Sequence, residues 1–262
     1  MNYLARNIAE LKISRANGPD AAIDMECLKQ ALVRFNGSIA KLRHFEVDVF
    51  GLLGMRNLSS FVGELFCAAI IKESSGQFLK NPHQDGYPDL LLMDPEGRKL
   101  WESLEQRRRE KEPFSPFVTG GIEVKATVGS LPSAAWFQKR SSQKPDIGDQ
   151  RIDYLKSYDW KAHHRDTNNL LGLVWDFVDR SPCVVGVFYS HKLTQNHWGK
   201  IITPKEGGGR TTSVSIMPRH GVAKMHEGWL IVIDDDRYID FLNKHNRSTL
   251  IQRAAAKSFA VS

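Results

Sequence analysis

The sequence predicts an α/β protein with a mixed central β-sheet flanked by helices and with an N-terminal helical region. Short apolar runs bounded by turn-forming residues recur along the chain, as expected of buried strands. Apolar residues at helical spacing precede these runs and follow them. The predicted order, helices first and then strands separated by long connections, is typical of a mixed sheet with helices around it.

Residues 1–58 are predicted to form the mostly helical N-terminal region. Within it, Met25–Leu42 places its apolar residues three and four positions apart, as on one face of a helix. A second helix is predicted from about Ser59 to Lys72, where Ser59 or Ser60 can cap the first turn. These two helices would cover the sheet.

Five apolar runs are predicted as strands: Asp89–Met93, Gly121–Val128, Leu170–Phe177, Cys183–Tyr189 and Gly228–Ile233. The charged stretch Lys99–Glu112 is predicted as a solvated helix or loop between the first two of them. A helical tail is predicted over Arg237–Lys257. With 262 residues, 41% of them hydrophobic, the chain can bury a sizeable core. We therefore expect one compact domain with three parts, namely 1–58, a core over 59–190 and an extension over 191–262.

Nothing in the sequence indicates a membrane or an oxidising compartment. No stretch approaches the roughly 18 consecutive apolar residues that span a bilayer, and the first residues lack the apolar run of a secretory signal. Cys27, Cys67 and Cys183 lie far apart without the paired spacing of a zinc site. We expect a cytoplasmic protein with reduced thiols and no membrane partner.

The charge distribution favours a polyanionic partner. The net charge is +6 and the isoelectric point is about 9.2, although basic proteins without nucleic-acid partners are common. Between His191 and Met225 there are six basic residues and one acidic residue, Glu206. The predicted C-terminal extension is therefore a candidate for contact with DNA.

Candidate catalytic residues stand in two of the predicted strands. Residues two apart share one face of a strand, so Glu123 and Lys125 point one way while Ile122 and Val124 point into apolar packing. Burying a carboxylate and an ammonium group there costs free energy unless they are paired. Asp89 opens the preceding strand, and if the two strands pair, it comes to lie beside Glu123.

Two neighbouring carboxylates repel each other unless a cation lies between them. An oxygen-rich site of this kind suits magnesium, which binds few protein carboxylates and keeps water ligands for a substrate phosphate. The lysine can then orient or deprotonate the attacking water, or offset charge that develops on the phosphorus.

The series Pro88-Asp89 followed by Glu123-Val124-Lys125 resembles the motif of the PD-(D/E)XK nuclease superfamily, which includes many type II restriction endonucleases. The resemblance covers roughly residues 58–190 and implies a restriction-endonuclease-like core for the sheet and its helices. It implies that Asp89 and Glu123 hold magnesium, with the Val124 carbonyl as a further ligand, and that Lys125 assists the water. It also implies products with 5′-phosphate and 3′-hydroxyl ends. Glu64 resembles a glutamate that many of these enzymes carry on the helix before the first core strand.

Each of these residues also has a plainer interpretation. The motif can be a surface carboxylate followed by an ordinary Glu–Lys pair on an exposed strand. Glu64 can be a half-exposed carboxylate that caps its helix or pairs with Arg56 or Lys72. Asp85, four residues before Asp89, is more typical of a turn.

Two segments are predicted to contact DNA, where phosphate contacts give affinity and base contacts give specificity. One follows the second catalytic strand and the other contains a glycine run without the lysine of a P-loop. The predicted DNA-binding residues are Lys139, Arg140, Lys144, Arg210, Thr211, Thr212 and Arg219. The alternative for both segments is a solvated basic loop.

Together these features predict a magnesium-dependent type II restriction endonuclease acting on double-stranded DNA. A small enzyme that cuts both strands acts most simply as a symmetric homodimer on a palindromic site. A companion DNA methyltransferase is expected in function, without forming a stable complex. The alternatives are a repair or recombination nuclease that recognises DNA structure, and a DNA-binding protein whose carboxylates are structural.

Overall fold

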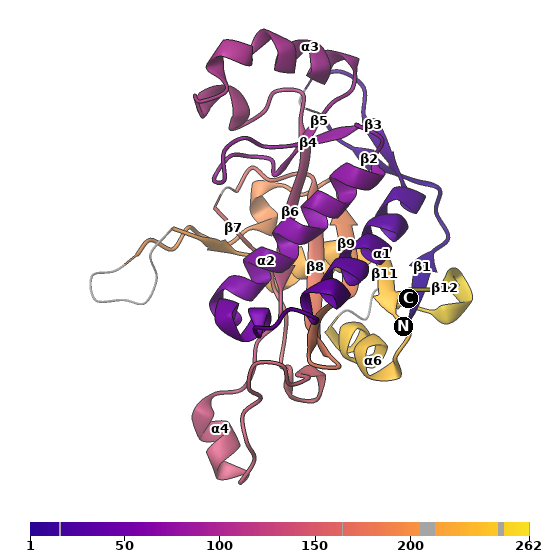
Figure 1. The fold of residues 1–262 in the computed structure, drawn as a ribbon, viewed down its shortest axis with the longest axis vertical. Helices are drawn as coiled ribbons and strands as arrows, with labels where there is room; N and C mark the ends of the chain where they lie inside the picture. Colours follow the sequence, from indigo (N-terminus) through magenta and orange to yellow (C-terminus); the bar gives the residue numbers. More distant parts are fainter. Residues whose placement is uncertain (16, 164, 205–212, 246–248, 262) are drawn as a thin grey trace.

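A mixed β-sheet forms the centre of the molecule in the computed structural model, which describes residues 1–15, 17–163, 165–204, 213–245 and 249–261 (Figure 1). In these ranges the sheet has eight strands, in the order β12-β1-β11-β9-β8-β6-β5-β4. Only β6 and β8 run parallel, and the other neighbours are antiparallel. The strands are β1 (Asn2–Arg6), β4 (Phe78–Lys80), β5 (Leu90–Leu92), β6 (Gly121–Thr127), β8 (Leu170–Val178), β9 (Ser181–Ser190), β11 (Trp229–Ile233) and β12 (Ala256–Ala260). The predicted α/β class with a mixed sheet is confirmed.

The central strands β8 and β9 are almost entirely buried, which explains why their sequences are continuous apolar runs. They form a hairpin whose turn residues, Asp179 and Arg180, both have positive φ, of 48° and 61°. Such a turn matches the twist of two antiparallel strands. The prediction that both runs are strands is confirmed.

Two helices, α1 (Met25–Leu42) and α2 (Val49–Glu73), pack against the sheet (Figure 1). Asp24 caps α1 by accepting a hydrogen bond from the backbone N–H of Glu26, at 2.8 Å. The bounds predicted for α1 are confirmed, whereas α2 begins ten residues before the predicted Ser59. The backbone of α2 leaves helical geometry at Gly54, where φ is 63°. A glycine tolerates this conformation, so the chain continues into a further turn of helix.

The prediction of a mostly helical N-terminal region is wrong before Met25. Residues of β1 pair with β11 on one side and β12 on the other, and two further strands, β2 (Glu10–Ile13) and β3 (Ala21–Asp24), pair with each other. Tyr3, Leu4 and Ala5 are all buried in β1. Their burial depends on strands more than 200 positions away in the chain, which local periodicity cannot indicate.

The C-terminal helix is also shorter than the predicted helical tail, Arg237–Lys257. Helix α6 (Asp236–His245) is amphipathic, but the chain then returns as β12, antiparallel to β1. The N-terminal and C-terminal segments thus add strands to the sheet that contains the predicted core. Between β5 and β6, the charged excursion forms α3 (Pro95–Ser103), capped by Asp94 and held by ion pairs from Arg15 to Asp94 and Glu96.

The remaining elements lie around the sheet. β7 (Lys161–Ala162) and β10 (Ser215–Ile216) form a two-stranded pair. The other helices are α4 (Ala134–Lys139), α5 (Arg219–Glu227) and the short 3₁₀ helices η1 (Glu105–Arg107), η2 (Glu112–Phe114), η3 (Ile152–Tyr154), η4 (Gln195–His197) and η5 (Arg253–Ala255). Within the described ranges, none of the helices has both the length and the apolar character needed to cross a bilayer.

The side chain of Asp176 in β8 forms hydrogen bonds with the segment at η3 and with α6. Its fully buried carboxylate accepts hydrogen bonds from the backbone N–H groups of Arg151, Ile152 and Phe177 and from the hydroxyl of Tyr238. Replacing Asp176 with alanine leaves these buried donors without their acceptor, so we expect the free energy of unfolding to fall by about 3 kcal/mol. Urea denaturation checks this, with Asp240→Ala on the exposed side of α6 as the control. A variant as stable as the control would contradict this role.

Candidate active site

The pairing of β5 with β6 brings the two predicted carboxylates together. The strands are antiparallel, with Leu90 opposite Ile122 and Leu91 opposite Gly121, so Asp89 and Glu123 are the next positions of the ladder. The close approach requires glycine at 121, because a Cβ there would lie 1.9 Å from the Leu90 carbonyl oxygen. The predicted strand pairing, and the proximity of Asp89 to Glu123, are confirmed.

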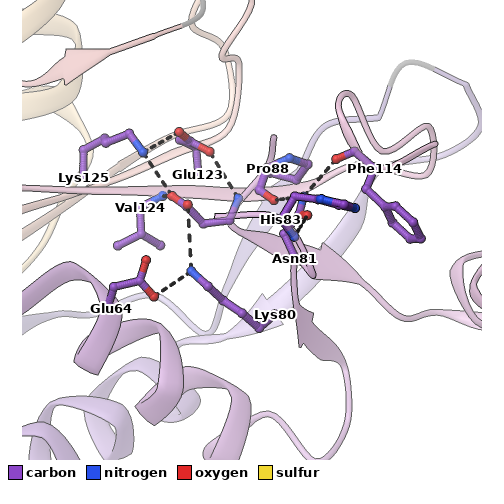
Figure 2. Close-up of polar contacts among 10 residues, drawn as sticks. Glu64, Lys80, Asn81, His83, Pro88, Phe114, Glu123, Val124 and Lys125 are labelled. Carbon is purple, nitrogen blue, oxygen red and sulfur yellow. Dashed lines mark hydrogen bonds and ion pairs between the residues drawn. The ribbon is translucent and has the colours of Figure 1, made fainter. Parts of the chain in front are cut away.

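Asp89, Glu123 and Lys125 form one cluster of ion pairs and hydrogen bonds (Figure 2). The Lys125 Nζ lies 2.5 Å from Glu123 Oε1 and 3.2 Å from Asp89 Oδ2. The backbone N–H of Asp89 donates to Glu123 Oε2 at 3.2 Å, and that of Val124 donates to Asp89 Oδ2 at 2.9 Å. Each carboxylate is therefore held by a backbone donor and by the same ammonium group.

The cluster is largely shielded from solvent. The exposed fraction of the side chain is 5% for Glu123, 12% for Asp89 and 24% for Lys125. The neighbouring Ile122 and Val124 are buried in the core. Breaking a buried ion pair leaves an uncompensated charge, so each member of the cluster depends on the others.

The pKa values of Glu123 and Lys125 are both raised, for different reasons. Burial is the largest influence on the pKa of Glu123, and together with the neighbouring Asp89 charge it raises this pKa to about 7. The positive charge of Lys125 lowers the pKa of Glu123, but by less. Burial alone would lower the pKa of Lys125, but Glu123 and Asp89 outweigh it and raise that pKa above the ordinary lysine value. Glu123 and Lys125 therefore both hold their protons more tightly than the same groups would in water.

A second lysine approaches the site from the other side of β6. Lys80, at the end of β4, places its Nζ 2.8 Å from Glu64 Oε2 and 4.0 Å from Asp89 Oδ1. Figure 2 shows Glu64 and Lys80 on one side of the strand and Lys125 on the other. The structure thus brings Glu64 to the predicted site, and Lys80 is its ion-pair partner.

The cluster forms one wall of an open cavity of about 400 Å³. Helix α2 forms another wall, and the segment around β7 a third. The cavity is lined by Ser59, Ser60, Gly63, Glu64, Cys67, Gln84, Asp85, Asp89, Val124, Lys125, Ala126, Lys161 and His163. Sequence reasoning missed Lys80 and Lys161. A lysine that ends a short apolar run before Pro88-Asp89 was the one local signal for Lys80.

The residues present fit a hard divalent cation. Asp89 and Glu123 offer carboxylate oxygens, which magnesium prefers. The amide and the carbonyl of one strand residue point to the same side, and the Val124 amide already bonds to Asp89, so the Val124 carbonyl lies on the side of the carboxylates. Within the described residues, no group of three or more His, Cys, Asp or Glu is arranged to hold a metal. The donors that the structure places together here are the carboxylates of Asp89 and Glu123 and the Val124 carbonyl.

The predicted DNA-binding residues are not gathered in the cavity. Lys139 ends α4, which lies at one extremity of the molecule in Figure 1. The guanidinium carbon of Arg140 lies 4.1 Å from the centroid of the Trp136 ring, Lys144 is exposed, and the exposed Arg219 begins α5. The other three predicted residues, Arg210, Thr211 and Thr212, lie outside the described residues.

Lys125 forms ion pairs with two buried carboxylates, so its positive charge should contribute to the stability of the fold. We expect Lys125→Met to lower the free energy of unfolding by about 2 kcal/mol in the presence of a chelator, a value reduced for the partial exposure of the lysine. Urea unfolding at pH 8 measures this, with Lys99→Met on the exposed surface of α3 as the control. In the double variant Asp89→Asn with Lys125→Met, the loss should be smaller than the sum of the single losses. Strict additivity would show that the two groups do not interact.

Comparison with known proteins gives no match to this chain, whether among protein-family models, curated proteins or solved structures. The function of the site is therefore inferred from its contacts, its burial and its charges.

Proposed function

We propose that the protein is a magnesium-dependent DNA endonuclease whose active site is the cluster of Asp89, Glu123 and Lys125. The observation that carries this proposal is the meeting of two buried carboxylates and one ammonium group at the joined ends of β5 and β6, in the wall of an open cavity. Carboxylates gathered in this way suit a divalent cation, and a lysine beside them suits an anionic substrate.

Asp89, Glu123 and the Val124 carbonyl would hold the metal ion. Bound magnesium supplies a Lewis acid for the phosphate oxygens and lowers the pKa of a coordinated water. Lys125 is an ammonium group in the structure, so its N–H groups can orient the attacking water or neutralise charge on a non-bridging oxygen. The raised pKa of Lys125 favours a role as hydrogen-bond donor over a role as the general base that deprotonates the water.

The motif resemblance narrows the proposal to a type II restriction endonuclease with a restriction-endonuclease-like core. Its substrate would be a specific short sequence in double-stranded DNA, and its products would carry 5′-phosphates. A homodimer remains the simplest assembly for cutting both strands, and a companion methyltransferase would protect host DNA. A nuclease that recognises DNA structure would share the same site, and its products would distinguish it.

The placement of the β7–β10 pair supports contact with DNA near the cavity. Lys161 and His163, in and after β7, line the cavity, and β7 pairs with β10. Ser215 and Ile216 of β10, which follow the glycine run of the predicted recognition segment, therefore lie beside a strand of the cavity wall, where a basic segment can bind phosphates.

Cleavage of plasmid DNA tests the proposed activity. We expect the wild type with magnesium to give discrete fragments, and Asp89→Ala and Lys125→Ala to lower the rate at least about a hundredfold, because the metal ligand and the phosphate or water donor are removed. Glu102→Ala, on the exposed surface of α3, is the control and should cut normally. Equal cutting by all four proteins would point to a contaminant. Cutting of branched DNA alone would favour the structure-specific nuclease.

The raised pKa of Glu123 predicts a pH-dependent requirement for metal. A proton and a cation compete for this carboxylate, and a raised pKa means that the proton is retained up to about pH 7. The concentration of magnesium needed for half-maximal cleavage should therefore be about tenfold higher at pH 6 than at pH 8. Excess magnesium should restore part of the rate at pH 6. The same half-maximal concentration at both pH values would argue against Glu123 as a ligand.

A further inference from the structure

Lys80 occupies the space between two carboxylates of the site. Its ammonium group is 2.8 Å from Glu64 and 4.0 Å from Asp89, and its side chain is 34% exposed, compared with 49% for that of Glu64. Lys80 comes from β4, opposite Leu90 in the ladder, and Glu64 comes from α2. Two separate elements of the fold therefore place a cation and its counter-ion next to Asp89.

Asp89 lies between two lysine–glutamate pairs, one on each side. On one side of β6, Asp89 Oδ2 contacts Lys125, which also binds Glu123. On the other side, Oδ1 faces Lys80, which binds Glu64 (Figure 2). Glu64 and Glu123 therefore reach Asp89 through two different lysines. This agrees with the finding that no three acidic side chains converge on one point in the described residues.

A second divalent cation that bridges Glu64 and Asp89 would have to lie where the Lys80 ammonium group now lies. Magnesium needs its ligand oxygens at about 2.1 Å. A magnesium ion bound to Asp89 Oδ1 on this side would therefore lie in the 4.0 Å gap between that oxygen and the Lys80 ammonium nitrogen. Unlike Lys125, Lys80 has an ion-pair partner, Glu64, that a cation at Asp89 and Glu123 would not take over, so its charge stays in place and repels a second ion. The fold thus fills this position with a charge of its own.

We propose that Lys80 takes the place of a second metal ion, so that the site binds a single divalent cation at Asp89 and Glu123 while Glu64 positions Lys80. This inference depends on the proposed nuclease function. The three carboxylates and two ammonium groups carry a net charge of minus one. One divalent cation changes it to plus one, which matches the single negative charge of a phosphodiester. In this proposal Lys80 supplies the positive charge beside Asp89, and Glu64 affects the site only by holding Lys80 in place.

The number of bound ions tests the proposal directly. Mn²⁺ is titrated into the full-length chain at pH 8, with free and bound ion measured by electron paramagnetic resonance. We expect one ion per chain, lost in Asp89→Asn. In Lys80→Met the carboxylates of Glu64 and Asp89 are freed, and we expect a second ion to bind with the spin-coupled signal of a close pair. Adding Glu64→Gln to Lys80→Met should return the count to one.

The outcomes separate this inference from the nuclease proposal. Two coupled ions on the wild type, or a single ion on Lys80→Met, would overturn the role of Lys80 and leave the nuclease proposal intact. Failure of Asp89→Asn to alter Mn²⁺ binding would refute the metal site, and with it both proposals. Circular dichroism verifies the fold of each variant. If Lys80→Met does not fold, Lys80→Gln replaces it, and the count on the wild type still decides between one ion and two.

Discussion

The ion pairs from Lys125 to Asp89 and Glu123 are the interaction on which the rest of the site depends. Carboxylates buried in a core cost several kcal/mol unless a cation and hydrogen-bond donors compensate them. Here one ammonium group serves both acids, and two backbone amides supply the remaining donors. The arrangement holds the acids close together, and under the proposed function a divalent cation would take over the lysine's contacts.

The unequal lengths of two strands create the opening. The ladder between β5 and β6 ends at Leu90 and Ile122, whereas β6 continues to Thr127. Beyond that point, the Val124 amide bonds to the side chain of Asp89 where a longer β5 would have offered a carbonyl. The free edge faces a cavity enclosed by α2 and the segment around β7. The cluster therefore lies at a strand end that borders an open cavity.

The sequence predicted those parts of the molecule that depend on neighbours in the chain. Continuous apolar runs indicated β8 and β9, and alternation around Val124 placed Glu123 and Lys125 on one face of β6. The predictions failed where burial depends on distant partners. In β12 none of the five residues is fully buried, so nothing local marks it as a strand, and β1 is too short to show a pattern. Lys80 reaches the site through the pairing of β4 with β5, and the short apolar run that ends at Lys80 does not by itself indicate this partner.

The most direct test of the central claim is a crystal structure of the chain grown with Mn²⁺, in which anomalous scattering locates the metal. The account predicts a peak about 2.2 Å from carboxylate oxygens of both Asp89 and Glu123, with the Lys125 ammonium group displaced from between them. Full occupancy of Mn²⁺ at some other place, with the three side chains still bound to one another, would contradict the account and leave the cluster with a structural role.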